Sequence, residues 1–363
     1  MSHHDASQAT TDRPNHGSTR EAVIVAGGFG SRLMPLTAHR PKHLLEVGGA
    51  PFLAHQLGRL AQAGVEHVVL ATSYRADLFE PVLGDGSAWG IRLSYVQEQE
   101  PLGTGGAIRN VADALTDDPD SAIVILNGDI LSGHDLAGQL DDFELPRNGR
   151  PVDVSLHLVE VEDARAFGCV PTDATGRVTG FVEKSDNPVT RQINAGCYVF
   201  RRRVIDTIPA GTVVSVERET FPGLVRDDAL VVGFLGNAYW RDVGTPEALV
   251  AASADLVLGV APSPEVEAEP SGALVDRDAI VAGDAVVNAG SAMGAGVEVQ
   301  ARAVVRGTVL MARAVVGEGA VLEDCAVGPG ARIGAGVTLR GVTVGDGAVV
   351  DEALPDGSRV DCA

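Results

Sequence analysis

Apolar residues recur at steps of five or six along the last quarter of the chain, and this period excludes most folds. An α-helix would need a period near 3.6, which these steps do not fit. Coils of short flat strands do fit, with one inward apolar residue on each side and small residues at the corners. The period therefore predicts a parallel β-helix of hexapeptide repeats over residues 273–357. The recurring residues are Val281, Val287, Met293, Val299, Val305, Met311, Val316, Leu322, Val327, Ile333, Leu339, Val344 and Val350.

The preceding part of the chain alternates expected strands and helices, which predicts a mostly parallel sheet covered by helices on both faces. Ligands bind such sheets at the carboxyl ends of the strands. The expected helices are Pro51–Ala63 and Gly105–Leu115. The expected strands are Glu21–Ala26, Glu66–Ala71, Arg92–Val96, Ala122–Leu126, Val152–Val159, Val178–Val182, Ile193–Phe200 and Leu230–Leu235.

Four segments follow from these patterns. Residues 1–20 are polar and indicate a disordered tail, and residues 21–257 form the strand-and-helix domain. Residues 258–272 are rich in Pro and Glu, which is typical of a linker. The repeat domain occupies residues 273–357.

Composition excludes several classes of partner. The net charge is −21, and so acidic a surface repels both nucleic acid and anionic membranes. The chain has no apolar run long enough to span a bilayer, and its first twenty residues lack the apolar stretch of a signal peptide. The four cysteines are scattered without a CxxC pair. We therefore expect a cytoplasmic protein with neither a disulfide framework nor a structural zinc site.

A glycine-containing loop, Gly27–Thr37, directly follows the first expected strand. Glycines there let backbone N–H groups approach phosphate closely, and Arg32 and Lys42 could neutralise a triphosphate. A lone Gly-x-Gly is more often an ordinary turn. A dinucleotide-binding loop is excluded because Leu33 stands at the third glycine position and no acidic residue ends the next strand. A Walker loop is excluded because the chain has no Gly-Lys pair.

Lysine is unusually rare in this chain. Of the 28 basic residues, only Lys42 and Lys184 are lysines. Arginine serves at every other basic position, so a retained lysine suggests a place that needs a compact ammonium group. Chance at low lysine usage is the alternative explanation.

The run from Gly27 to Lys42 resembles GGxGxRLxPLTxxxPK, the signature of the sugar-1-phosphate nucleotidyltransferases, or sugar-nucleotide pyrophosphorylases. Ser215–Pro222 is similar, more narrowly, to the mannose-1-phosphate guanylyltransferase branch, in which a C-terminal hexapeptide-repeat domain is usual. The resemblance covers about residues 21–354 and implies an α/β fold: a Rossmann-like mixed-sheet domain followed by a left-handed parallel β-helix. Further motifs in the family's order are Glu100–Gly106, Asn127–Asp129, Phe181–Lys184, Asn194–Gly196 and Trp240–Pro246.

The resemblance also implies roles for individual residues. Those that would bind the nucleotide are Ala26, Gly27, Gly28, Gly30, Glu100 and Gly105. Those that would bind the sugar phosphate are Gly168, Glu183, Lys184 and Asn194. Asp129 and Asp242 would hold Mg²⁺, and the residues that would act in catalysis are Arg32, Lys42, Asp129 and Lys184.

Each assignment has an ordinary alternative. Asp129 could cap a helix, Asp242 could shape a turn before Gly-Thr-Pro, and Lys184 could form a solvated pair with Glu183. Met34 and His43 depart from residues common in the branch, which leaves the exact substrate open.

The base preference depends on Glu100, which begins the loop expected to face the nucleobase. Guanine presents N1–H and its N2 amino group, two adjacent donors that one carboxylate can accept. This pattern favours GTP. The alternative is that Gln97 or Gln99 contacts the base and Glu100 is solvent-exposed.

The expected reaction is nucleotidyl transfer from GTP to a hexose 1-phosphate, with mannose 1-phosphate as the first candidate. Glucose, heptose and cyclitol 1-phosphates, or another nucleoside triphosphate, are the alternatives. Acyl transfer by the repeat domain is disfavoured because residues 273–363 contain no histidine. A non-catalytic regulatory subunit is the other class considered, and it is disfavoured because Arg32, Lys42, Asp129 and Asp242 are all present. The apolar repeats favour a homo-oligomer, a dimer or tetramer formed through the β-helix.

Overall fold

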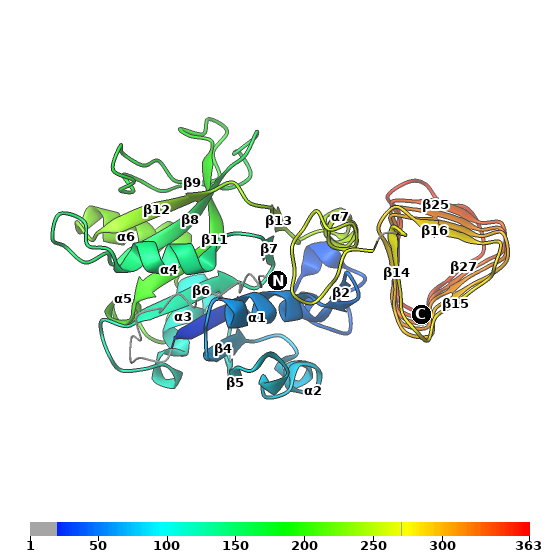
Figure 1. The fold of residues 1–363 in the computed structure, drawn as a ribbon, viewed down its shortest axis with the longest axis horizontal. Helices are drawn as coiled ribbons and strands as arrows, with labels where there is room; N and C mark the ends of the chain where they lie inside the picture. Colours follow the sequence, from blue (N-terminus) through cyan, green and yellow to red (C-terminus); the bar gives the residue numbers. More distant parts are fainter. Residues whose placement is uncertain (1–19, 270) are drawn as a thin grey trace, which may run out of the picture.

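The computed structural model describes residues 20–269 and 271–363. The expected disordered tail lies almost entirely outside the described residues. The chain forms a layered α/β part and a triangular β-helix, which lie side by side with helix α7 (Pro246–Val257) between them (Figure 1). No helix of the described residues has both the length and the apolar character needed to cross a membrane.

A mixed sheet forms the centre of the α/β part. Its main path has the order β10-β9-β11-β6-β1-β4-β5, and β8 joins β11 to β12. Strands β1, β4, β5 and β6 run parallel, whereas β11 runs antiparallel to β6. The strands are β1 (Glu21–Ala26), β4 (His67–Thr72), β5 (Arg92–Gln97), β6 (Ala122–Asn127), β8 (Val154–Glu160), β9 (Gly168–Cys169), β10 (Val182–Glu183), β11 (Gln192–Arg201) and β12 (Val231–Gly236).

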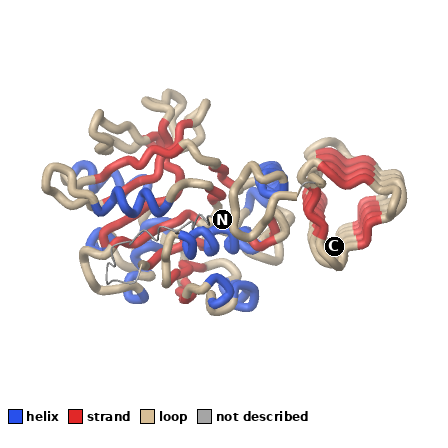
Figure 2. Tube along the Cα trace, viewed as in Figure 1, coloured by secondary structure: helices blue, strands red, loops and turns tan. Residues whose placement is uncertain are grey.

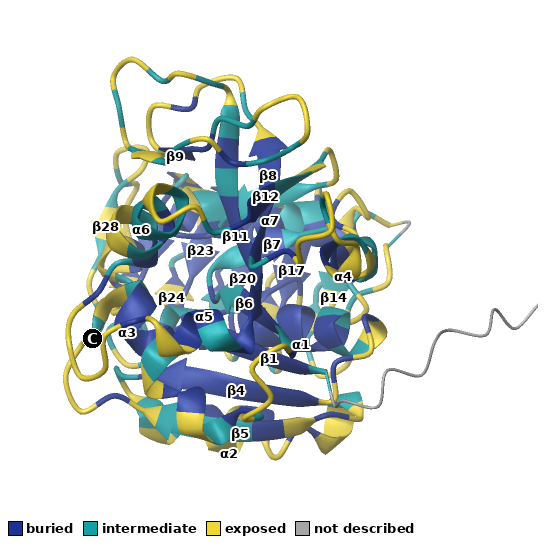
Figure 3. Cartoon of the chain, turned by 90° about the vertical axis from the view of Figure 1, so that its left-hand side faces the viewer, coloured by how far each residue is buried: buried dark blue, intermediate teal, exposed yellow. Residues whose placement is uncertain are grey.

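Helices cover both faces of the sheet because side chains of the central strands alternate between two cores. In β1, Ala22 and Ile24 face a core with α1, α2 and α4, and Val23 faces a core with α3, α5 and α6. The central strands are almost entirely buried, as Figure 3 shows. The helices are α1 (Phe52–Gln62), α2 (Phe79–Leu83), α3 (Gly103–Asn110), α4 (Leu136–Glu144), α5 (Arg202–Asp206) and α6 (Phe221–Arg226).

Most expected elements of this part match the structure to within two residues, and two do not. Val178–Val182 was expected as one strand, but only β10 forms, with Val178 in an isolated bridge to Thr172. The expected helix Gly105–Leu115 begins at Gly103 and ends at Asn110, and a short 3₁₀ turn, Ala112–Ala114, follows. In the second case the apolar pattern marks burial correctly but does not fix the local hydrogen bonding, whereas in the first case Val182 is exposed.

The C-terminal part is a parallel β-helix with three strand-lined sides, drawn in red in Figure 2. One side contains β14 (Ala273–Val275), β17 (Ser291–Met293), β20 (Val309–Leu310), β23 (Ala326–Val327), β26 (Thr343–Val344) and β28 (Arg359–Val360). The second contains β15 (Ile280–Val281), β18 (Glu298–Val299), β21 (Val315–Val316), β24 (Arg332–Ile333) and β27 (Val349–Val350). The third contains β16 (Val286–Asn288), β19 (Val304–Arg306), β22 (Val321–Glu323) and β25 (Thr338–Arg340).

The expected inward residues line the β-helix, with one exception. Met311 was expected inside, but Leu310 fills that position, in register with Met293 and Val327. The turn at Gly307, where φ is +53°, shortens the step from Val305 to five residues, which shifts the inward position by one. Met311 instead packs toward the α/β part.

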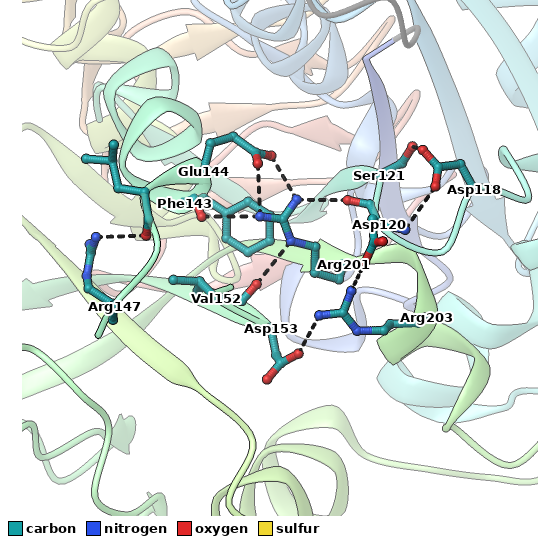
Figure 4. A network of polar contacts seen from close by, with 11 residues as sticks. Asp118, Asp120, Ser121, Phe143, Glu144, Arg147, Val152, Asp153, Arg201 and Arg203 are labelled. Atoms are coloured by element: carbon teal, nitrogen blue, oxygen red, sulfur yellow. Dashed lines mark hydrogen bonds and ion pairs between the residues drawn. The ribbon is translucent and has the colours of Figure 1, made fainter. Parts of the chain in front are cut away.

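A buried arginine connects the end of β11 to neighbouring elements (Figure 4). Arg201 donates to both carboxylate oxygens of Glu144, at 3.0 and 2.9 Å, and to the carbonyls of Asp120 and Val152. Its guanidinium also lies 4.2 Å from the centroid of the Phe143 ring. These contacts satisfy the arginine's donors, and burial of its charge is therefore tolerated.

Two histidines are buried and stacked behind the sheet. The rings of His134 and His157 lie 3.9 Å apart between centroids, and neither His157 nitrogen has a hydrogen-bond partner among the described residues. Burial, together with the positive charge of Arg59, lowers the pKa of His134 to about 4 and that of His157 to about 2. Both rings are therefore neutral in the folded protein at ordinary pH.

We expect the α/β part to lose stability as the pH falls below 6.5. Unfolded histidine takes up a proton near pH 6.5, whereas the folded rings do not. The stability that depends on these two neutral histidines is therefore fully present above pH 6.5 and is lost progressively as the pH falls below it. Each such histidine should lower the free energy of unfolding by about 1.4 kcal/mol per pH unit down to its folded pKa.

Urea unfolding followed by tryptophan fluorescence measures this pH dependence, because the chain's two tryptophans, Trp89 and Trp240, both lie in the α/β part. His157→Leu should flatten the dependence between pH 7 and pH 5, and the exposed control His39→Gln should leave it unchanged. Equal slopes in the wild type and His157→Leu would contradict the assignment.

Candidate active site

Strands β1 and β6 pair in parallel, so the loops that follow them meet at the same edge of the sheet. The glycine loop follows β1 at Gly27, and Asn127-Gly128-Asp129 follows β6. Gly128 donates its N–H to the carbonyl of Val25 at 3.0 Å, and this bond ties the second loop to the first strand. The topology thus brings together two motifs that are about a hundred residues apart.

Lys42 crosses the glycine loop. A side chain at Gly30 would come within 2.9 Å of Lys42 Cβ, and one at Gly28 within 3.4 Å of Lys42 Cε. Gly30 also has φ of +67°, a conformation that favours glycine. Gly30 is therefore required for the close approach of the lysine, whereas a Cβ at Gly28 would make an ordinary van der Waals contact with it.

The ammonium of Lys42 forms a short ion pair with Asp129. The two side chains are 14% and 24% exposed, so solvent screens their attraction only partly. Burial alone would raise the pKa of Asp129, but the charge and hydrogen bond of Lys42 outweigh it and lower that pKa. Asp129 is thus a carboxylate in the folded protein.

The second predicted metal ligand, Asp242, lies next to the first. It ends strand β13 (Trp240–Asp242), which pairs antiparallel with β7 (Ile130–Ser132) directly after Asp129. Val243 donates its N–H to the Asp129 carbonyl at 2.9 Å. Arg32 Nη2 lies 4.0 Å from an Asp242 carboxylate oxygen, with its side chain 64% exposed.

His43, next to Lys42, is buried and neutral. Its side chain is 2% exposed, and burial lowers its pKa to about 3, with a further contribution from Lys42. Its ring lies against Gly128, where an added Cβ would meet His43 Cδ2 at 2.8 Å. His43 therefore fills space beneath the loop that carries Asp129.

Three of the four predicted sugar-phosphate residues gather at the other end of the sheet. Glu183 in β10 pairs with Gly168 in β9, and a side chain at Gly168 would meet Glu183 Oε2 at 2.7 Å. Burial raises the pKa of Glu183, and the nearby Glu217 raises it further. Asn194 donates to the Tyr198 hydroxyl at 2.8 Å and accepts from the Gly196 N–H at 3.1 Å.

The fourth, Lys184, has an exposed side chain and a backbone φ of +43°. Its N–H donates to the Phe167 carbonyl at 3.2 Å. This backbone bond fixes the position of the residue, and its ammonium reaches solvent. No described contact joins Lys184 to the other predicted residues.

The remaining residues predicted to bind the nucleotide include Ala26, Gly105 and Glu100, which lie in different surroundings. Ala26 ends β1 directly before the glycine loop. Gly105 is buried in α3 and donates its N–H to the Val214 carbonyl at 2.8 Å, and a Cβ there would meet Val214. Glu100 is exposed on its loop. Gly105 therefore packs α3 against a neighbouring loop, whatever else it contacts.

Sequence reasoning missed Glu98, which is only 6% exposed. Its carboxylate accepts a long hydrogen bond, 3.5 Å, from the Leu102 N–H, while Oε1 has no partner among the described residues. Burial raises the pKa of this carboxyl. A side chain at Gly27 would come within 3.5 Å of Glu98 Oε2. The sequence gives only one hint of it, a position two residues after the expected strand Arg92–Val96.

A family model described as nucleotidyl transferase matches residues 21–257. The chain belongs to the nucleotidyl transferase family. The mannose-1-phosphate guanylyltransferase of Mycobacterium tuberculosis is 49% identical over 91% of this chain and 83% of its own length. The probable mannose-1-phosphate guanylyltransferase 1 of rice is 36% identical, and the match covers 62% of each chain.

Solved structures give the same result for the fold. The crystal structure of HddC from Yersinia pseudotuberculosis matches with a TM-score of 0.55 and 29% identity, over 65% of this chain and 98% of that one. A structure of HddC complexed with GMP-PN matches equally well, at 28% identity.

The residues at the sheet edge of this nucleotidyl transferase fit a divalent cation. Asp242 Oδ1 is buried without a hydrogen-bond partner among the described residues. Burial raises the pKa of Asp242, and the negative charge of Asp129 raises it further. Carboxylate oxygens are the ligands that Mg²⁺ prefers. A cation between Asp129 and Asp242 would satisfy the buried oxygen and relieve the repulsion.

We expect Mn²⁺, used as a probe for the divalent site, to bind more weakly to Asp242→Asn than to the wild type. The amide keeps the shape but removes one anionic ligand. Because the folded pKa of Asp242 is raised, wild-type affinity should also fall as the pH is lowered toward that pKa. Isothermal titration without substrate measures both effects. Equal affinities for Asp242→Asn and the wild type would remove the assignment, and the distant Asp278→Asn serves as the control.

Proposed function

We propose that this protein transfers a guanylyl group from GTP to mannose 1-phosphate, giving GDP-mannose and pyrophosphate. The observation that carries the proposal is the 49% identity to a mannose-1-phosphate guanylyltransferase over 91% of this chain. The meeting of Lys42, Asp129 and Asp242 at one sheet edge supports it. Glucose, heptose and cyclitol 1-phosphates are the alternative acceptors, which a substrate panel would separate.

In the proposed reaction, an oxygen of the sugar phosphate attacks the α-phosphorus of GTP. The new P–O bond forms as the bond between the α-phosphorus and the bridging oxygen breaks, and pyrophosphate leaves with that electron pair. No general base is needed because a phosphate monoester is already largely dianionic near neutral pH. Catalysis is then mainly a matter of positioning the two phosphates and neutralising their charge.

The chain's own residues have separate tasks in this reaction. Backbone N–H groups of Gly27, Gly28 and Gly30 face the triphosphate. Lys42 and Arg32 neutralise the charge that develops on the leaving pyrophosphate. Divalent metal is general in this family, and when bound by Asp129 and Asp242, Mg²⁺ would supply Lewis-acid stabilisation of phosphate oxygens.

The acceptor would bind near β9, β10 and β11. Glu183 and Asn194 would accept from or donate to sugar hydroxyls, with Gly168 leaving room beside Glu183. Lys184 would hold the sugar phosphate with its exposed ammonium. Assembly into a homo-oligomer through the β-helix stays a prediction.

Two carboxylates compete for the role of reading the base. Glu98 is buried beside Gly27, and one of its oxygens has no hydrogen-bond partner among the residues that the structure describes, whereas Glu100 is exposed. A buried carboxylate without a charged partner is costly unless a ligand supplies donors. Guanine N1–H and its N2 amino group supply two. We therefore assign recognition of guanine to Glu98 in place of Glu100.

Comparing GTP with inosine triphosphate tests this assignment, because hypoxanthine lacks the N2 amino group. One hydrogen bond to a charged acceptor corresponds to roughly a ten- to hundredfold preference for GTP in kcat/KM. Glu98→Gln should reduce that preference about tenfold, and Glu100→Gln should leave it unchanged. An equal loss with both nucleotides in Glu98→Gln would indicate a structural role, and a change confined to Glu100→Gln would restore the original assignment.

The two lysines should serve different substrates. Lys42→Ala should raise the KM for GTP or lower kcat by roughly thirty- to several-hundredfold, because its charge is largely buried. Lys184→Ala should raise the KM for mannose 1-phosphate, by only about three- to thirtyfold because the side chain is exposed. Lys42→Arg should not restore activity, since the planar guanidinium does not fit against Gly28 and Gly30.

Steady-state kinetics with both substrates varied measures these effects. A Lys42→Arg variant equal to the wild type would mean that the scarcity of lysine in this chain has no functional meaning.

A further inference from the structure

The glycine loop, Gly27–Thr37, packs against the β-helix; it is called the phosphate loop below because the proposed function places the triphosphate there. Leu33 and Leu36, within the signature motif, are 1% and 0% exposed. They belong to one apolar cluster with Val309, Met311 and Ala326 of the β-helix, and residues of α7 complete it. The loop that faces the nucleotide on one side is thus supported by another domain on the other.

Polar contacts from the last coils hold the second half of the glycine loop and the residues that lead to Lys42. Arg40 donates to both oxygens of Asp346, at 3.1 and 2.6 Å, with side chains 23% and 18% exposed. Arg359 donates to the Met34 carbonyl at 3.1 Å. The bidentate Arg40–Asp346 pair is the strongest of these contacts, because both partners are charged and partly buried.

Arg40 is separated from Lys42 only by Pro41. The buried proline has a fixed backbone, so the position of Arg40 determines where the short 3₁₀ turn Lys42–Leu44 begins. From that turn, the lysine side chain crosses the glycines and reaches Asp129. A displacement at Arg40 therefore moves the ammonium at the site.

We propose that Asp346 of the β-helix is a positioning residue for the phosphate loop, acting through Arg40 on Lys42. The β-helix is then part of the working geometry of the nucleotide site, in addition to any role in assembly. The contact joins residues 306 positions apart in the chain. The signature motif by itself therefore does not predict it.

The same carboxylate also lies close to donors of His39 and Cys362, all within 4.8 Å of one another. Such a set could in principle hold a metal ion. Both oxygens of Asp346 are already engaged by the Arg40 guanidinium, however, and its positive charge opposes a second cation at the same place. The geometry therefore favours the ion pair as the function of Asp346.

Asp346→Asn in the full chain tests the proposal, since it removes the charge and keeps the shape. We expect the KM for GTP to rise roughly two- to thirtyfold, the range for a coupling that acts through an intermediate residue, with the KM for mannose 1-phosphate unchanged. Glu323→Gln is the matched control. The Glu323 carboxylate is 29% exposed and, like that of Asp346, accepts hydrogen bonds from arginine. Its two partners, Arg306 and Arg340, both lie within the β-helix.

Hydrogen exchange gives a readout that does not depend on turnover. Amides of residues 33–45 should exchange faster in Asp346→Asn than in the wild type or Glu323→Gln. Arg40→Asp and Asp346→Arg, each made as a single substitution, should raise the KM for GTP. The double variant, in which the two charges are exchanged, should show a smaller rise in this KM than either single variant.

The outcomes separate this proposal from the proposed function on which its kinetics rest. If the wild type fails to turn over GTP and mannose 1-phosphate, the proposed function is wrong, and exchange in residues 33–45 still tests the contact. If Asp346→Asn lowers the melting temperature or kcat but leaves both the KM for GTP and the loop exchange unchanged, Asp346 only stabilises the fold and the proposal is overturned. Equal effects of Glu323→Gln would also overturn it.

Discussion

The ion pair between Lys42 and Asp129 is the contact on which the geometry of the site depends. It joins the loop after β1 to the loop after β6, two neighbouring parallel strands. It also keeps Asp129 charged in a partly buried place, where desolvation alone would raise the pKa. This contact explains the glycine at position 30, since a side chain there would clash with Lys42. The site is therefore organised around one ammonium group.

Support for that ammonium comes from two directions. The sheet holds Asp129 through the topology of β1 and β6, and His43 fills the space beneath Gly128. The β-helix holds the other side through Leu33 and Leu36 and through Arg40. If Lys42 binds phosphate, as the proposed function requires, its ammonium must be placed to within a few tenths of an ångström, and support from two sides would provide this. This explains why the signature motif extends well beyond the glycines that face the ligand.

The sequence predicted most of the sheet strands and the β-helix, because these follow from the periodicity of apolar residues. It did not predict the ion pair of Lys42 with Asp129. It did not predict Leu310 as the inward residue, since the turn at Gly307 shortens one step of the coil. Nor did it find Glu98 or Asp346. The burial of Glu98 depends on how the loop after β5 folds back. The contact of Asp346 with Arg40 depends on how the two domains pack against each other. Neither leaves a local pattern in the chain.

The charge balance at the sheet edge couples the two ligands of the proposed reaction. Lys42 pairs with Asp129, while Asp242 has a raised pKa and a buried oxygen with no partner among the described residues. Under the proposed function, a triphosphate that engages Lys42 would draw it from Asp129 and leave two adjacent carboxylates without enough positive charge. Repulsion between the carboxylates would then increase, and their affinity for a divalent cation would increase with it. By reciprocity, a cation at Asp129 and Asp242 would free Lys42 for phosphate. In a chain with net charge −21, this exchange would let an anionic nucleotide bind at an acidic edge without a large basic surface.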